Sequence, residues 1–353
     1  MTFERVIGGE MAIDGGAISV NGSGAWPTFG KAHALRCDTG RSALKLALAD
    51  WRGRGGAAAR VWLPSYVCPS VNEAVSQLGL RVEVYGDRPG SASWSRAPQP
   101  EDGDLVLLVH YFGVLNRPAL AWLAGFPARH WSVLEDCVQA PYTEGAGLSG
   151  DYAITSLRKW WPAPDGALVC ANHALIDAAL LPPNEAFVSQ RCAAKLLRGQ
   201  GGDEATQLAW VAGSEHLLEQ AVPRETSWLS LLLLAGVDTA TAIARRRANW
   251  RALAAGLASS GAVVPLFAGL ADGETPLVFP VLLADETRDP LRRFLIGRRI
   301  YCPIHWQLSQ NEASEDHALA RRILSLPIDQ RYDARDMSFL LSHINEFFTK
   351  DEP

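Results

Sequence analysis

Short apolar runs recur through the first half of the chain, and stretches with helical spacing lie between several of them. Continuous apolar runs of about five residues are typical of strands buried on both faces of a sheet. Their alternation with helical patterns predicts βαβ units. We therefore expect a doubly wound, mostly parallel α/β domain. The predicted strands are residues 61–63, 81–85, 104–109, 131–134, 152–156 and 167–171.

The rest of the chain has a different pattern. The first 34 residues are rich in glycine and polar turn residues and are expected to form an extended arm, whereas residues 172–235 have helical character. Asp238 is a good N-cap for a long amphipathic helix. Beyond that helix, strands (277–283, 300–304) alternate with helices (290–296, 334–348). We predict an arm and a large domain over residues 1–240, and a smaller α+β domain over residues 241–353.

Two ionisable residues end neighbouring apolar runs. Asp136 closes one run and Lys159 follows the next, and ligands of open α/β sheets bind where such strands end. A carboxylate and an amine placed in this way suit pyridoxal 5'-phosphate (PLP). The lysine would form the Schiff base, and the aspartate would keep the pyridine nitrogen protonated. A strand-end aspartate can also simply cap a helix or form an ion pair.

Lysine is a rare residue in this chain. Five lysines accompany 28 arginines, so Arg carries most of the positive surface charge. Lys159 follows an apolar strand pattern, and a solubility role is therefore not expected for it. A free lysine has a pKa of about 10.4, so a catalytic Lys159 is expected to be buried near other cations. Arg158 is one such cation, unless it points to the opposite face of the strand.

A glycine-containing turn opens the first helical pattern. Thr39, Gly40, Arg41 and Ser42 precede apolar positions that continue to about Trp51. Free backbone amides and the helix dipole at such a turn favour a phosphate, although Thr39 or Ser42 could serve only as a cap. No glycine-rich dinucleotide fingerprint and no P-loop follows any predicted strand.

The amino-acid composition argues against several classes of function. The 353 residues are 48% hydrophobic and 20% charged with a net charge of −5, which is typical of a soluble protein and argues against nucleic acid as a partner. The six cysteines form no Cys-x-x-Cys pair, so we expect free thiols, no metal site and a cytoplasmic location. The most apolar run, 229–235, is too short to span a bilayer. No membrane association is expected.

The order of motifs resembles the DegT/StrS family of PLP-dependent sugar aminotransferases, which have the fold type I architecture. The resemblance covers nearly the whole chain, and its segments occur in the family's order. Residues 135–140 are close to the family's Glu-Asp-x-x-Gln-Ala motif. The matching segments are 7–10 (IGGE), 39–44 (TGRSAL), 63–66 (LPSY), 109–113 (VHYFG), 135–140 (EDCVQA), 300–306 (IYCPIHW) and 326–327 (LP).

The resemblance implies roles for individual residues. Asp136 would pair with the pyridine nitrogen, and Gln139 would hydrogen-bond the ring 3'-oxygen. Lys159 would form the Schiff base and then move the proton between carbons. Ser156 would bind the phosphate together with the amides of Gly40 and Arg41.

The chain also departs from the family pattern. Cys68 falls where the family stacks a side chain on the cofactor ring, so Tyr66 or Tyr111 is expected to stack instead. The Asn-Tyr-Arg-Met segment that the family sends across its dimer interface has no counterpart in residues 223–238. Candidate substrate contacts are His110, His305 and Trp306, although a lone histidine in an apolar strand is more often a core residue.

The implied reaction is transfer of an amino group from an amino acid, with glutamate the expected donor, to a keto sugar, with a nucleotide-linked sugar the expected acceptor. Such an enzyme belongs to sugar or polysaccharide biosynthesis. A homodimer with shared active sites is expected, with the run 229–235 as a candidate interface. Two alternatives stay open. One is a PLP-dependent lyase or dehydratase, and the other is a non-catalytic relative that binds PLP or a sugar.

Overall fold

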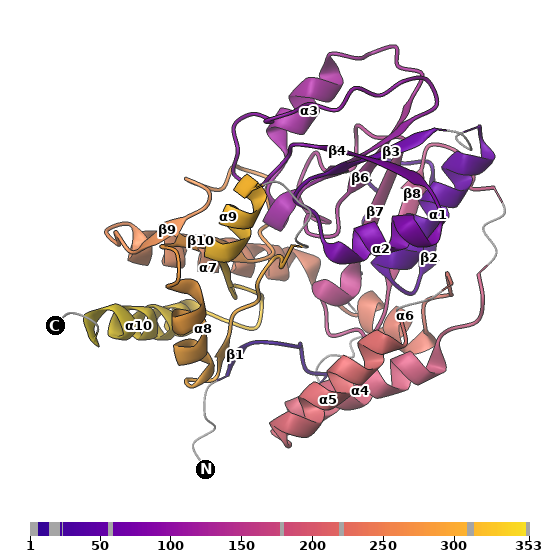
Figure 1. Ribbon diagram of the computed structural model, residues 1–353. Coiled ribbons are helices and arrows are strands. Elements are labelled where there is room, and N and C mark those ends of the chain that lie inside the picture. The colour runs from indigo at the N-terminus through magenta and orange to yellow at the C-terminus, as the bar shows by residue number, and fades with distance from the viewer. Residues whose placement is uncertain are drawn as a thin grey trace.

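The computed structural model describes residues 6–13, 22, 24–55, 59–176, 180–218, 222–308 and 314–350. At its centre is a seven-stranded sheet with the order β2-β8-β7-β6-β5-β3-β4 (Figure 1). Strand β8 runs antiparallel to both of its neighbours, and the other pairs are parallel. The predicted fold type I architecture, with its mostly parallel sheet, is confirmed. The strands are β2 (His33–Cys37), β3 (Arg60–Pro64), β4 (Arg81–Tyr85), β5 (Leu105–Val109), β6 (Ser132–Asp136), β7 (Tyr152–Ser156) and β8 (Ala167–Ala171).

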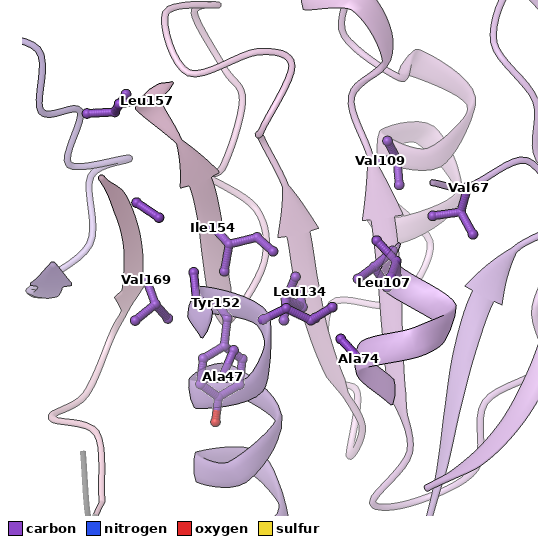
Figure 2. Packing of buried hydrophobic residues seen from close by; sticks show 14 of the residues in the cluster. Ala47, Val67, Ala74, Leu107, Val109, Leu134, Tyr152, Ile154, Leu157 and Val169 are labelled. Carbon is purple, nitrogen blue, oxygen red and sulfur yellow. The ribbon is translucent and has the colours of Figure 1, made fainter. Parts of the chain in front are cut away.

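Helices cover both faces of this sheet. Helices α1 (Gly40–Gly53) and α2 (Pro69–Gln77) pack on one face, where Ala47 and Ala74 meet side chains of β5 to β8 (Figure 2). Helix α3 (Arg117–Ala124) packs on the other face against β3, β5 and β6. Successive strand residues point to opposite faces, so strands covered on both sides must be apolar throughout. The continuous runs of β5, β7 and β8 are accordingly all buried.

Strand β2 corrects one prediction. Residues 33–37 lie at the edge of the large sheet, paired with β8. Residues 33–34 were expected in the arm, and no strand was predicted for residues 35–37. Only Cys37 of this strand is buried, and His33, Ala34 and Arg36 are exposed. A half-exposed edge strand lacks the continuous apolar run by which the other strands were predicted. Residues 1–5, 14–21 and 23 of the expected arm lie outside the described residues.

A helical region links the large sheet to a second, smaller sheet. Helices α4 (Glu185–Gly199) and α5 (Glu204–His216) pack together as a hairpin at the lower edge of the molecule (Figure 1). Helices α6 (Trp228–Ala235) and α7 (Thr239–Leu257) follow. The Asp238 carboxylate accepts a hydrogen bond from the Thr241 amide at 3.0 Å, so Asp238 is the N-cap that the sequence predicts.

The second sheet is antiparallel, in the order β12-β10-β9. Its core joins α7 and the C-terminal helix to these strands. The elements are β9 (Val263–Pro265), β10 (Phe279–Leu283), α8 (Arg288–Ile296), α9 (Ser314–Arg322), β12 (Ile323–Leu326) and α10 (Ala334–Lys350). The division at residue 240 stays a prediction.

The N-terminal strand belongs to this second core. Strand β1 (Ile7–Gly8) pairs in parallel with β11 (Ile300–Tyr301), and Ile7 is fully buried. The Gly8 amide donates to the Tyr332 hydroxyl at 2.7 Å. Gly8 has φ +83°, and a Cβ there would lie 2.0 Å from the Tyr301 carbonyl oxygen. Only glycine fits this position.

Within the described residues, no single helix is long and apolar enough to cross a membrane, and α6 with α7 reaches that length only as a pair bent by 73°.

Candidate active site

A cleft with about 720 Å³ of empty space, part of it open to solvent, lies at the carboxyl ends of β5, β6 and β7. This is the place where open α/β sheets bind ligands. Residues before and within α1 form one part of its lining, and Trp306 reaches it from the C-terminal region. The lining residues used below are Gly40, Arg41, Asp136, Gln139, Ser156, Arg158, Lys159 and Trp306.

Asp136 is the last residue of β6 and is buried. Its Oδ1 accepts a hydrogen bond from the Val138 amide at 2.9 Å, and no hydrogen bond from another described residue reaches Oδ2. Burial raises the pKa of Asp136, although the positive charge of Lys159 acts in the opposite direction. A cationic group in the cleft would therefore find a carboxylate oxygen without a competing donor.

Gln139 lies three residues further along and is also buried. Its Oε1 accepts a hydrogen bond from the Phe112 amide at 2.7 Å, which fixes the orientation of the side-chain amide. Its Nε2 is buried without a hydrogen-bond partner. An unsatisfied buried donor costs about 1–3 kcal/mol. The site therefore lacks one acceptor, which an oxygen atom of a bound ligand would supply.

The N-terminus of α1 and the end of β7 meet at another part of the cleft. Thr39 caps the helix by accepting from the Ser42 amide at 3.2 Å, and the first amides of any α-helix have no partner within it. A Cβ on Gly40 would lie 3.3 Å from the Cβ of Ser156, so glycine permits this close approach. Ser156 is 2% exposed, and its hydroxyl has no hydrogen-bond partner among the described residues.

Lys159 follows β7 in a short 3-10 turn, η3 (Leu157–Lys159). Its side chain is exposed, so the burial expected for it is not found. It lines the cleft and also a second cavity of about 900 Å³ of empty space. The second cavity is bordered by the N-terminal arm and by Arg246, His305 and Arg331. Lys159 thus lies between two spaces, and molecules bound in them would cover it.

His305 and Trp306 lie beside Lys159, one in each cavity. The His305 Nδ1 is 2.9 Å from the Ser325 hydroxyl oxygen. Burial, and secondarily the charge of Lys159, lower the pKa of His305 to about 3, so its imidazole is neutral at physiological pH. Trp306 is the only aromatic residue among the described residues that line the cleft.

The two tyrosines expected to stack on a cofactor do not line the cleft. The Tyr66 hydroxyl donates to the His305 carbonyl at 2.5 Å and accepts from the Trp306 amide at 3.1 Å. The Tyr111 hydroxyl donates to the Tyr66 carbonyl at 2.7 Å. Both tyrosines are buried. Their rings support Trp306, at centroid distances of 5.8 and 6.3 Å.

His110 is likewise not in the cleft. It is fully buried, with Nε2 2.7 Å from Glu135 Oε2 and Nδ1 accepting from the Asn116 amide at 3.2 Å. The expected substrate contact of His110 therefore has no support in the structure. His110, Glu135 and Cys137 place possible metal ligands within 4.8 Å of one another. However, three backbone amides of the loop at 147–150 already donate to Glu135. A structural role in holding this loop therefore explains Glu135 without a metal.

A cluster of charged side chains next to the cleft was not predicted from the sequence. The Glu215 carboxylate is 3.0 Å from Arg158 Nη1 and 3.7 Å from Arg41 Nη2, and both arginines line the cleft. Glu215 also pairs with Arg191. The cluster brings α1, the turn after β7 and the α4–α5 hairpin together. Residues 184–218 contain only two arginines, Arg191 and Arg198, so the composition of the hairpin gave no signal of the cluster.

Comparisons with known proteins identify the fold. No family model matches the chain, and no curated protein matches it in sequence. Solved structures do match. A Streptococcus pneumoniae protein assigned as a sugar aminotransferase, in its PMP form, is 11% identical with a TM-score of 0.69 and covers 99% of this chain and 100% of its own. A sugar aminotransferase from Micromonospora echinospora is 18% identical with a TM-score of 0.61 and covers 90% and 88%. A DegT/DnrJ/EryC1/StrS aminotransferase from Brucella abortus is 17% identical with a TM-score of 0.56 and covers 90% and 87%.

The fold is that of these aminotransferases. At such identities the likeness extends to the architecture, which agrees with the fold implied by the DegT/StrS resemblance. The roles of individual residues depend on the geometry described above.

Proposed function

We propose that the protein is a PLP-dependent aminotransferase. It would transfer an amino group from an amino acid, with glutamate the expected donor, to the keto group of a sugar, with a nucleotide-linked sugar the expected acceptor. The observation that carries the proposal is the arrangement of Asp136, Gln139 and Lys159 around one cleft. A carboxylate oxygen, an amide N–H and an amine there all lack hydrogen-bond partners among the described residues.

These unpaired groups fit PLP. The Asp136 oxygen would hold the protonated pyridine nitrogen, and the free Gln139 Nε2 would donate to the ring 3'-oxygen. The Ser156 hydroxyl and the first amides of α1, at Gly40 and Arg41, would donate to the phosphate. When bound, PLP supplies a ring that takes up the electron pair left by cleavage of a bond to the amino-bearing carbon.

The position of Lys159 suits it both to bind the cofactor and to move a proton. Its side chain lines the cleft and the second cavity, so it would lie between the proposed cofactor and the proposed substrate. A base placed in this way can take a proton from one carbon and return it to another. His305 beside it is neutral at physiological pH and adds no competing positive charge.

The second cavity favours anionic substrates. Arg246 and Arg331 line it, together with Asp329, which pairs with Arg331 at 2.7 Å. The Arg246 Nη2 is buried without a hydrogen-bond partner. Arginine recognises carboxylates and phosphates through paired hydrogen bonds. Glutamate and a nucleotide-linked sugar both carry such groups.

A second copy of the chain is the proposed partner. Trp228 of α6 is 84% exposed and Leu232 is 45% exposed. Leu208 of the α4–α5 hairpin is also exposed. Trp228 and Leu232 are four residues apart on one helix and so lie on the same face, and exposed apolar side chains grouped in this way indicate an interface. Sedimentation at micromolar concentration is expected to show a homodimer, and a monomer would contradict the proposal. We also propose that the enzyme acts in the cytoplasm, where its cysteines stay reduced.

The absorbance spectrum of the purified protein tests the proposed function. Protein incubated with PLP should show the band of lysine-bound cofactor near neutral pH. Addition of glutamate without acceptor should then convert this band to that of the amine form. A protein that binds PLP but is not converted by any amino donor would contradict transamination. Product formation without consumption of an amino donor would instead indicate a lyase or dehydratase.

A further inference from the structure

The charged cluster beside the cleft carries more positive than negative charge. Its cations are Arg41, Arg158, Arg191 and Lys195, and its carboxylates are Glu10 and Glu215. Glu10 pairs with Lys195 at 2.7 Å and with Arg191 at 2.8 Å, and Glu215 pairs with the three arginines. We call this group of six residues the cation cluster.

Both carboxylates of the cluster are ionised. Burial alone would raise the pKa of Glu10, but Lys195 and Arg191 lower it to about 2. Arg158 and Arg191 likewise keep the pKa of Glu215 below its usual range despite burial. The two carboxylates therefore offset two of the four cations. Asp38 lies close enough to act on Arg158, but burial raises its own pKa. All four cations contact a carboxylate, but at least one positive charge remains without a compensating negative charge.

This excess charge is at the cleft. The side chains of Arg191 and Lys195 are almost completely buried, whereas those of Arg41 and Arg158 are 25% and 19% exposed. Arg41 and Arg158 line the same cleft as Gly40 and Ser156. The Arg158 Nε is buried without a hydrogen-bond partner. Excess positive charge in a partly buried cluster is costly, so the geometry favours an anion between the two arginines and the start of α1.

Glu215 determines where these arginines lie. It is near the end of α5, and one carboxylate contacts both arginines. The Arg41 guanidinium also donates to the Leu218 carbonyl at 3.5 Å, and the Arg158 guanidinium lies 6.0 Å from the centre of the Phe187 ring. The α4–α5 hairpin thus fixes two side chains that come from the large sheet region.

We propose that Arg41 and Arg158 bind the cofactor's phosphate through their side chains, within the same chain that carries Lys159, and that Glu215 positions both guanidinium groups. This inference depends on the proposed PLP function and identifies the charges that hold the cofactor. The ligand chemistry is a phosphate monoester dianion. Glu215 is a positioning residue, since it reaches the phosphate only through the arginines.

The test compares PLP with pyridoxal, which lacks the phosphate. Dissociation constants of the apoprotein for both ligands are measured by absorbance titration for wild type, Arg41→Ala and Arg158→Ala. Each substitution is expected to weaken PLP binding by at least about tenfold, because a guanidinium–phosphate contact is charge-assisted and often bidentate. Pyridoxal binding should change by less than about twofold by the same argument. Arg52→Ala is the matched control, since Arg52 is an exposed cation on the same helix.

A second measurement uses the wild-type chain and does not depend on how the variants fold. Phenylglyoxal modification of arginines is followed by peptide mass spectrometry, with and without PLP. PLP, and inorganic phosphate at higher concentration, should protect Arg41 and Arg158, whereas pyridoxal and glutamate should not. Protection of Arg158 by glutamate but not by phosphate would overturn the inference, because it would place a substrate carboxylate there.

The outcomes separate this inference from the function on which it depends. A wild-type protein that develops no band with PLP would contradict the proposed function. A wild-type protein that binds PLP, with a dissociation constant that both alanine variants leave unchanged, would overturn the arginine assignment alone. Equal losses for PLP and pyridoxal would also overturn it, because they would indicate a structural role.

Discussion

The two ends of the cleft are built in different ways. At the end that carries Asp136 and Gln139, each side chain is fixed by one nearby backbone amide, from Val138 and Phe112. At the end that carries Arg41 and Arg158, the side chains are held by ion pairs that reach across three parts of the chain. The first end depends on single hydrogen bonds from backbone amides, and the second depends on a network of ion pairs.

This difference predicts which substitutions change activity and which also change the stability of the fold. A substitution at the Asp136 end removes one group and leaves the rest of the fold in place, so its effect should appear mainly in rate or affinity. Replacing a carboxylate of the cation cluster leaves a buried positive charge without its ion-pair partner, so the effect should appear in stability as well. The following variants test that separation.

The largest effect is expected for Lys159→Ala. It removes the proposed nucleophile and base, so the band of lysine-bound cofactor should disappear and the transamination rate should fall by about 10³-fold or more. PLP should still bind, because the phosphate end is unchanged, and equilibrium dialysis would detect it. Lys45→Ala is the control lysine. An unchanged absorbance band in Lys159→Ala would remove this residue from its proposed role.

Asp136→Asn should have the next largest effect. The amide keeps the shape of the side chain but cannot keep a pyridine nitrogen protonated, so kcat should fall by about 10²–10³-fold. The melting temperature should stay close to that of wild type, because burial already disfavours the charged form of Asp136. Steady-state kinetics at saturating PLP, with thermal unfolding in parallel, would measure both. A large loss of stability with little loss of rate would contradict the difference proposed between the two ends of the cleft.

Gln139→Glu tests the unpaired donor at the Asp136 end of the cleft. One carboxylate oxygen can still accept from the Phe112 amide, but the free N–H of Nε2 is lost. PLP affinity should fall by about tenfold, which corresponds to one hydrogen bond of about 1.4 kcal/mol. Gln139→Met, which removes the acceptor as well, is the companion variant and should also lower the melting temperature. Equal PLP affinity in Gln139→Glu and wild type would exclude the proposed contact with the 3'-oxygen.

The smallest effect on chemistry, and a clear one on stability, is expected for Glu10→Gln. The folded-state pKa of Glu10 is about 2 against an ordinary value of 4.5. Its stabilising contribution is therefore complete above pH 4.5 and is lost as the pH falls towards 2. At pH 7 the substitution should lower the free energy of unfolding by up to about 3 kcal/mol. Urea unfolding at pH 7 and at pH 3 should show a smaller difference from wild type at the lower pH.

The sequence predicted the parts of the molecule whose signals are local. Strands β6 and β7 are continuous apolar runs, and parallel strands end at the same edge of a sheet, so Asp136 and Lys159 could be placed near one cleft from their positions alone. Asp238 could be predicted as a cap because a cap and its helix are neighbours in sequence. Edge strand β2 was missed because it is half exposed and carries charged residues.

The remaining features depend on tertiary contacts. Tyr66 and Tyr111 belong to segments that resemble the family. The Tyr66 hydroxyl, however, donates to the backbone carbonyl of His305, more than 200 residues away in the sequence. Arg158 and Glu215 are separated by 57 residues, and their contact exists only because the α4–α5 hairpin folds back against η3. Neither the hydrophobic periodicity nor the spacing of motifs predicts that the hairpin packs there.

Strand β1 connects the proposed cofactor site to the core of the second sheet. Its amides bond to the Arg299 carbonyl and the Tyr332 hydroxyl, and Glu10, two residues later, belongs to the cation cluster. A ligand that stabilises the folded state slows the local openings on which hydrogen exchange depends. Cofactor occupancy should therefore be detectable as slower deuterium uptake at Ile7 and Gly8, although neither residue lines the cleft that would hold the cofactor.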